Sequence, residues 1–160
     1  MAEGLQHVLR STWKQQLATG FILGDPYRPV ETRIAPDPIT GVDFRFRWLP
    51  HRELRTDPAE LERRGILDPA CVEADLFRDP RDDSGRHCFL CADNVAICHP
   101  LETLVPITAG NRQWLAGANF AWLATDHFTV MSDTHEDQIY SKDVLEAMLD
   151  INEQTNGEFR

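Results

Sequence analysis

The sequence predicts an α+β fold in which a largely antiparallel sheet is flanked by helices. Apolar residues recur at helical spacing over 5–17 and again over 144–151, whereas residues 42–48 alternate between apolar and basic side chains. Proline and glycine turns separate the short strand candidates, which favours antiparallel pairing. With 160 residues, 42% of them apolar, the chain can bury a core without a metal or disulfide to staple it.

The first part of the chain predicts one helix followed by a strand pair. Residues 5–17 predict an amphipathic helix, and Gly20 is placed to end it. Residues 30–34 and 42–48 predict two antiparallel strands joined by the Pro/Gly turn at 37–41. Because the second strand alternates apolar and basic residues, we expect it to be half-buried.

The middle of the chain predicts a short helix, a polar loop and three further strands. The helix is expected at 58–64, and the loop at 79–85, which has almost no apolar content, is expected to be exposed. Apolar runs predict strands over 101–107, 119–124 and 128–131. The last two strands are expected to meet at a tight turn.

The last part of the chain predicts a capped helix and an unfinished strand. Ser141 is expected to cap a helix that carries its apolar residues on one stripe. Residues 156–160 predict a turn and the start of another strand, so we expect the chain to be a fragment. We divide it into 1–85, with the amino-terminal helix, strand pair and polar loop, and 86–160.

Composition excludes several classes of function. A net charge of −10 argues against a general nucleic-acid binder, which needs surplus Lys and Arg to neutralise phosphates. No apolar run approaches the ~20 residues of a membrane span, and the start lacks the pattern of a secretory signal. We therefore expect a cytoplasmic protein whose four cysteines are reduced rather than paired.

Cys88 and Cys91 form the sharpest local motif, a Cys-x-x-Cys pair. Two thiolates three positions apart can clamp one tetrahedral metal ion from a tight turn. They could instead pack as small hydrophobic side chains. A redox pair is the third interpretation, but it needs a strand-to-helix setting, and residues 92–94 look like a poor helix start.

Further metal ligands would have to come from elsewhere in the chain. Cys98 and His99 are close in sequence but are also suited to starting a strand. His135 lies in a loop between a predicted strand and helix, where ligands are often presented, and could equally be a solvated loop histidine. His127 is interpreted as a turn residue.

Other polar residues give weaker signals. Asn119 could contact a base or ribose hydroxyl, or could simply satisfy a turn. Arg45 and Arg47 could form a phosphate-facing patch or only the wet face of a sheet. The sequence has no Gly-rich phosphate loop, dinucleotide fingerprint or nucleophile elbow.

Taken in order, these motifs resemble a known enzyme family. Cys88-x-x-Cys91, Asn119-Phe-Ala-Trp-Leu, the segment from Phe128 to His135 and a helix running to Thr155 are similar to the amino-terminal half of galactose-1-phosphate uridylyltransferases. The resemblance extends to relatives in the histidine-triad (HIT) superfamily, including dinucleoside polyphosphate phosphorylases. It covers residues 86–160 and implies a HIT-like, incomplete half-fold.

The resemblance implies a structural zinc ion and a nucleotide-binding site. Carried over to this chain, it implies Cys88, Cys91 and His135 as metal ligands, with the fourth supplied by the catalytic region, and Asn119 as a substrate contact. It also implies a nucleotide or sugar-nucleotide substrate. Relatives are often dimers, so a homodimer is a further expectation; nucleic acid and membranes are not expected partners.

The family's catalytic segment is missing from the sequence. That His-x-His motif supplies the nucleophilic histidine, and this chain contains no His-x-His. We therefore assign no catalytic residue and expect the amino-terminal part of a nucleotidyltransferase or phosphorylase, acting on a sugar nucleotide or dinucleoside polyphosphate and inactive alone. The alternative is a non-catalytic, zinc-stabilised domain that binds a nucleotide or a partner protein.

Overall fold

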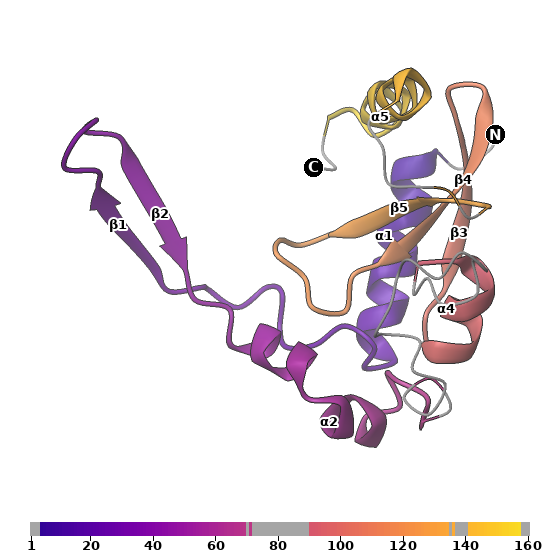
Figure 1. Ribbon diagram of the computed structural model, residues 1–160, viewed down its shortest axis with the longest axis horizontal. Helices are drawn as coiled ribbons and strands as arrows, with labels where there is room; N and C mark the ends of the chain where they lie inside the picture. The colour runs from indigo at the N-terminus through magenta and orange to yellow at the C-terminus, as the bar shows by residue number, and fades with distance from the viewer. Residues whose placement is uncertain (1–3, 70, 72–89, 135, 137–140, 158–160) are drawn as a thin grey trace.

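The computed structural model combines helices with two small antiparallel sheets, which confirms the α+β prediction. It describes residues 4–69, 71, 90–134, 136 and 141–157. A globular body holds most elements, and one β-hairpin extends well away from it (Figure 1). The predicted loop at 79–85 lies outside the described residues.

The body is built on helix α1, Leu5–Ala18, which confirms the first predicted helix. Its apolar stripe buries Leu9 and Trp13, and Gly20 takes a left-handed φ of 80° that few other residues tolerate. The buried Gln16 side chain donates to the Leu101 carbonyl at 2.6 Å and accepts from the Thr103 amide. These bonds fasten the helix to the segment that leads into the main sheet.

The main sheet is an antiparallel meander of β3 (Leu104–Ala109), β4 (Arg112–Ala118) and β5 (Phe128–Ser132). Strands β3 and β5 agree with the strands expected at 101–107 and 128–131, whereas β4 was missed. The strand expected at 119–124 is wrong, because those residues form the loop between β4 and β5.

Helices α1 and α5 both contact this sheet. Helix α5, Lys142–Gln154, begins at Ser141, whose hydroxyl accepts the Val144 amide at 3.2 Å, as the sequence predicted. It buries Ala147 against the sheet together with α1 residue Leu9. Most of the predicted apolar stripe of α5, however, lies on its outer side.

The hairpin consists of β1 (Thr32–Pro36) and β2 (Asp43–Arg47), paired in antiparallel register. A turn joins them: the Asp37 carboxylate accepts the amides of Ile39 and Thr40, and these bonds lower the pKa of Asp37. The strand pair was predicted correctly, but the expected half-burial is wrong. All ten strand residues are exposed because the hairpin packs on no other described element.

The hairpin joins the body through two short helices. The 3-10 helix η1 spans Pro50–Thr56, and α2, Pro58–Arg63, confirms the helix expected at 58–64. Asp57 caps α2 by accepting the Glu60 amide at 3.1 Å. Side-chain hydrogen bonds from arginines 63 and 64 lower the pKa of Glu60 to about 2.

A disulfide joins Cys71 to Cys98 at the end of α4, Ala92–Cys98, with 5.3 Å between the two Cα atoms. Both cysteines are fully buried in one core with Trp13, Phe21 and Trp122, so residues from before and after position 85 share that core. The expectation that all four cysteines are reduced is therefore wrong for this pair. Burial side by side brings their sulfur atoms within bonding reach.

Among the described residues, no helix is both long and apolar enough to cross a membrane.

Candidate functional site

Of the three predicted metal ligands, Cys91 lies among the described residues. Cys91 is partly exposed and stands at the amino-terminal cap of α4, while Cys88 and His135 lie outside the described residues. In the part of the chain that the structure describes, no three His, Cys, Asp or Glu side chains are grouped so as to hold a metal ion.

The start of α4 removes the objection to a redox pair at Cys88 and Cys91, which was that no helix was expected to follow it. Residues 92–94 were expected to be a poor helix start, yet α4 begins at Ala92. Asp93 places a negative charge in the first turn, and the buried Val95 and Cys98 fix the helix to the core. The redox interpretation therefore loses the objection raised against it, and it stays untested.

Cys98 and His99 do not supply the remaining ligands. Cys98 is bonded to Cys71, and His99 ends α4 rather than starting a strand. The His99 ring is buried with Nδ1 2.8 Å from the Ile66 carbonyl oxygen. Because a carbonyl only accepts, Nδ1 must carry a proton; burial lowers the pKa of His99, and this bond partly offsets the effect.

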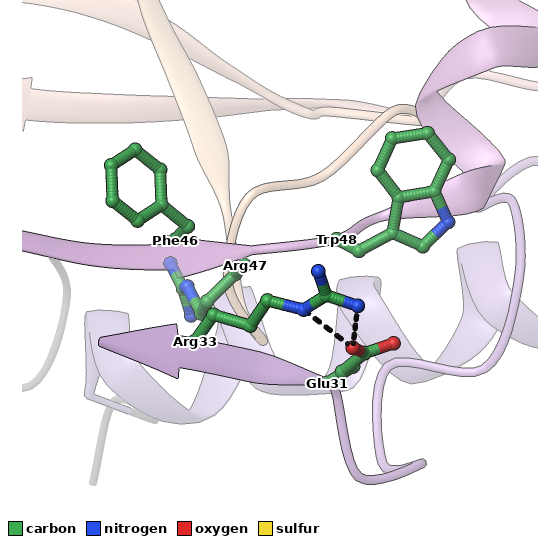
Figure 2. A pocket seen from close by; sticks show the side chains of 5 residues that line it. All are labelled: Glu31, Arg33, Phe46, Arg47 and Trp48. Atoms are coloured by element: carbon green, nitrogen blue, oxygen red, sulfur yellow. Dashed lines mark hydrogen bonds and ion pairs between the residues drawn. The ribbon is translucent and has the colours of Figure 1, made fainter. Parts of the chain in front are cut away.

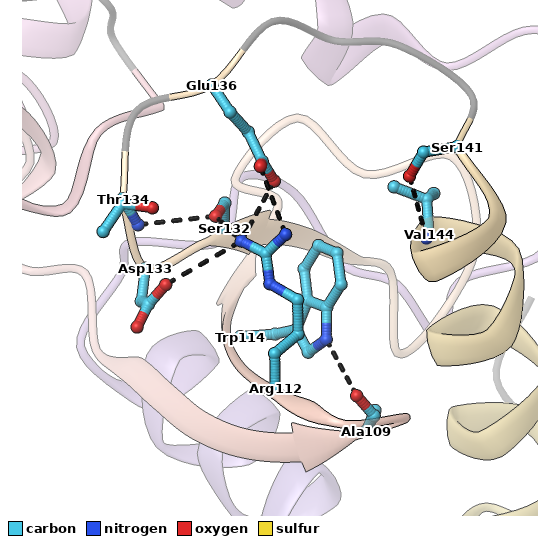
Figure 3. A network of polar contacts seen from close by, with 9 residues as sticks. All are labelled: Ala109, Arg112, Trp114, Ser132, Asp133, Thr134, Glu136, Ser141 and Val144. Atoms are coloured by element: carbon cyan, nitrogen blue, oxygen red, sulfur yellow. Dashed lines mark hydrogen bonds and ion pairs between the residues drawn. The ribbon is translucent and has the colours of Figure 1, made fainter.

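The loop after β5, which leads to position 135, is fixed by a cationic anchor that the sequence did not reveal (Figure 3). Arg112, at the start of β4, donates to Ser132 and lies 3.1 Å from a Glu136 carboxylate oxygen and 4.0 Å from one of Asp133. Its guanidinium also lies over the Trp114 ring, 4.4 Å from the centroid. The hydrogen bond from Arg112 is the main reason that the pKa of Glu136 is lowered.

This anchor defines where a ligand at position 135 would be attached. Residues 134 and 136 flank that position, and the Thr134 amide donates to Ser132 at 3.4 Å. The two described residues on either side of position 135 are therefore both connected to β4 through Arg112 or its partner Ser132.

Asn119 is placed in a turn directly after β4. Its backbone amide donates to the His127 carbonyl at 2.9 Å, and its side-chain oxygen accepts the Ala121 amide at 3.1 Å. The side-chain nitrogen donates to no described residue. The turn function that was left open is thus confirmed, and one donor is available for a ligand oxygen.

The loop between β4 and β5 is held by contacts from distant segments. Trp122 donates to the Leu23 carbonyl at 2.6 Å and stacks on the His51 ring at a centroid distance of 4.1 Å. His127 is the expected turn residue: its Nδ1 accepts the Leu123 amide at 3.0 Å. Burial, followed by the charge of Arg52, lowers the pKa of His127.

A shallow hollow of about 490 Å³ lies on the hairpin, lined by Glu31, Arg33, Phe46, Arg47 and Trp48 (Figure 2). Arg33 forms an ion pair with Glu31 at 2.9 Å. Arg47 and Arg45 contact no acidic side chain among the described residues. Of the two interpretations of these arginines, the structure supports an exposed surface, with aromatic rings beside it.

Glu102, in the segment just before β3, is an unusual carboxyl group. It covers Gly117 so closely that a Cβ at that position would collide with its carboxylate oxygen. No described cation pairs with it, and burial raises its pKa to about 7. No local pattern around Glu102 indicates this, because the glycine that it covers lies fifteen positions away.

Glu102→Gln should remove a pH-dependent loss of stability. The folded-state pKa is raised above the ordinary 4.5, so the folded chain holds the proton more tightly. The protonated carboxyl therefore contributes to the free energy of unfolding below pH 4.5. This contribution is lost as pH rises toward 7, a change of about 2–3 kcal/mol. Urea unfolding at pH 5 and pH 8 should show the variant gaining relative to the parent chain at pH 8.

Two features make this comparison specific. His99 and His127 have lowered pKa values and act in the opposite direction over the same range, so the difference between variant and parent is the quantity to follow. The exposed Glu62→Gln serves as control and should leave the difference constant. Equal behaviour of Glu102→Gln and Glu62→Gln would refute the prediction.

No model of a known protein family, no curated protein and no solved structure matches this chain.

Proposed function

We propose that this chain is the zinc-bearing, amino-terminal part of a HIT-like nucleotidyltransferase or phosphorylase that acts on a sugar nucleotide or dinucleoside polyphosphate. The observation that carries the proposal is the order β3–β4–β5–α5, with Arg112 anchoring the loop that leads to position 135. The resemblance implies a strand from Phe128 followed by a helix that runs to Thr155, and β5 and α5 occupy those positions. A cytoplasmic location is part of the proposal.

The proposed zinc site fits what is described of its surroundings. The Cys91 thiol is partly exposed, takes no part in the disulfide and stands at a helix amino terminus, where a thiolate is favoured. Cys88 and His135 complete the proposed set, with a fourth ligand from a catalytic region. Such an ion would stabilise the fold rather than take part in the reaction.

The proposed nucleotide contact rests on Asn119. Its side-chain oxygen is used within the turn, which fixes the amide group and leaves the nitrogen to donate to a ligand oxygen. A hydrogen bond of this kind orients a substrate and adds about 1 kcal/mol of affinity. The nucleophile is not assigned, because the sequence contains no His-x-His, so we expect no turnover by this chain alone.

Zinc binding is the decisive test. We expect metal analysis after zinc titration to find about one ion per chain, and Cys91→Ser to weaken binding at least ~10-fold, because it removes a thiolate ligand. Cys88→Ser and His135→Ala should do the same. The matched control is the Cys71→Ala/Cys98→Ala pair, which should keep the metal.

Two results would contradict the proposed site. One is a parent chain that takes up no zinc even when metal is titrated back. The other is a Cys91→Ser variant that binds as tightly as the parent.

A second candidate, a partner-binding domain, is favoured by one observation. The hairpin exposes Phe44, Phe46 and Trp48 together, at 49%, 57% and 61% of their surface. Exposed apolar patches mark interaction sites, and aromatic residues are enriched at protein interfaces.

A further inference from the structure

The hairpin from residue 30 to residue 48, here named the arm, leaves its apolar side chains unburied. A two-stranded hairpin is at best marginally stable in water unless another surface covers it. The rings of Phe44 and Phe46 lie beside each other with 6.5 Å between their centroids, in a tilted arrangement. The exposed apolar residues of the arm are Ile34, Ile39, Val42, Phe44, Phe46 and Trp48.

The arm also differs from the rest of the chain in charge. It carries three arginines and three carboxylates, so the whole net charge of −10 lies outside it. The carboxylates sit at its base and tip: Glu31 is paired with Arg33, and the Asp37 carboxylate is used in the turn. Arg45 and Arg47 remain without an acidic partner among the described residues.

Helix α5 presents the opposite combination of properties. Leu145, Met148 and Leu149, spaced to share one face, are exposed at 52%, 56% and 70%. Glu153 lies one turn beyond Leu149 and has no basic partner among the described residues. The helix holds four acidic residues against one lysine. Its outer surface is thus apolar and acidic, whereas the arm is apolar and presents unpaired arginines.

The two surfaces lie on different sides of one molecule. Figure 1 shows the arm leaving the body beyond η1 and α2, whereas α5 covers the far end of the main sheet. In Figure 1 the arm stands well apart from α5 of the same chain, so the two surfaces do not meet within one molecule. A second copy can offer its α5 to the arm.

We propose that the arm docks on α5 of a second copy, with Phe46 and Trp48 packing on Leu145, Met148 and Leu149 and Arg47 facing Glu153. In a two-fold symmetric dimer this contact occurs twice, because the arm of each copy packs on α5 of the other. The inference does not depend on the proposed zinc site or on nucleotide binding. It names the contact surfaces that a homodimer of this chain would use.

Single-stranded nucleic acid is the competing occupant of the aromatic face. Bases stack readily on exposed rings of this kind. Its phosphates would, however, have to approach a chain of net charge −10, and only two arginines are unpaired on the arm. Charge therefore favours the acidic helix.

The first experiment is sedimentation equilibrium of the full chain over a range of concentrations. We expect a monomer–dimer equilibrium whose dissociation constant rises ~100-fold or more in Phe46→Thr/Trp48→Thr, since buried aromatics dominate interfaces. Met148→Gln/Leu149→Gln should weaken the dimer similarly. Ile97→Thr, which removes an equally exposed apolar side chain from α4, is the matched control and should change nothing.

The second experiment identifies the contact itself. Arg47→Glu should weaken the dimer and Glu153→Arg should restore it in the double variant, which a merely unfolded arm cannot reproduce. A photo-crosslinker at position 48, used in a mixture of isotope-labelled and unlabelled chains, should yield arm–α5 peptides of mixed label. Unchanged thermal unfolding of the monomers checks that each variant folds.

Three results would overturn the proposal. A chain that stays monomeric at the highest concentration would do so, as would a dimer that ignores both the arm and the helix variants. The third is tight binding of a labelled single-stranded oligonucleotide that Phe46→Thr/Trp48→Thr abolishes, with no arm–α5 crosslink.

Discussion

Trp122→Ala is expected to lower the free energy of unfolding by about 3–5 kcal/mol, because it empties a large buried site. Only 3% of the Trp122 surface is exposed. The substitution also leaves the Leu23 carbonyl without its donor and removes the ring that stacks on His51. These two partners come from separate segments, so the loss should loosen the β4–β5 loop and the base of the arm together.

Chemical denaturation provides the measurement, at concentrations low enough to keep the chain monomeric. Trp48→Ala is the matched control: it removes the same side chain from a position that is 61% exposed and should cost less than about 0.5 kcal/mol. A similar loss of stability in both variants would show that Trp122 does not join the segments as described.

Breaking the disulfide is the second large effect. Cys71 and Cys98 are 27 positions apart, and a cross-link of that span restricts the unfolded chain enough to stabilise the fold by about 3–4 kcal/mol. Cys71→Ala/Cys98→Ala should lose that amount. A reducing agent should lower the stability of the parent chain equally and leave the double variant unaffected.

Thiol counting gives an independent readout for the same bond. Alkylation of the denatured, metal-free chain should modify Cys88 and Cys91 and spare the bonded pair. Cys91→Ala is the control and should remain sensitive to the reducing agent. Labelling of all four cysteines in material never exposed to a reducing agent would be incompatible with the bond.

Helices α1, α2 and α5 could be predicted because their signals are local, whereas α4 was missed. In α1 the apolar spacing and Gly20 agree, and in α5 the Ser141 cap marks the first turn. Strand β4 was missed because Ala116, Gly117 and Ala118 lack the bulky or branched side chains that mark a strand.

The prediction of a strand at 119–124 was wrong for the opposite reason: its side chains are typical of a strand although the segment is a loop. Its apolar residues look like a strand, but Trp122 is buried and Phe120 partly buried by segments distant in sequence. The exposure of β2 could not be predicted either, because an alternating strand is half-buried only where another element covers one of its faces.

In the candidate site too, local features could be predicted and contacts between distant segments could not. The motif containing Cys91 could be found from the sequence because it depends on neighbouring residues, whereas the turn at Asn119 was only one of two interpretations left open. The Arg112 anchor could not, because its partner Glu136 is 24 positions away and nothing local marks the pair. Likewise, the pKa of Glu102 is raised by burial in the folded chain, and its close contact with Gly117 joins residues fifteen positions apart.

The exposure of the arm gives the molecule a natural optical probe. Of its four tryptophans, Trp13, Trp114 and Trp122 are exposed by 5% or less, whereas Trp48 stands in water on the arm. A collisional quencher such as iodide therefore reaches one indole and leaves three shielded. The quenchable part of the intrinsic fluorescence reports on the arm alone, without any label, and the remaining emission reports on the body.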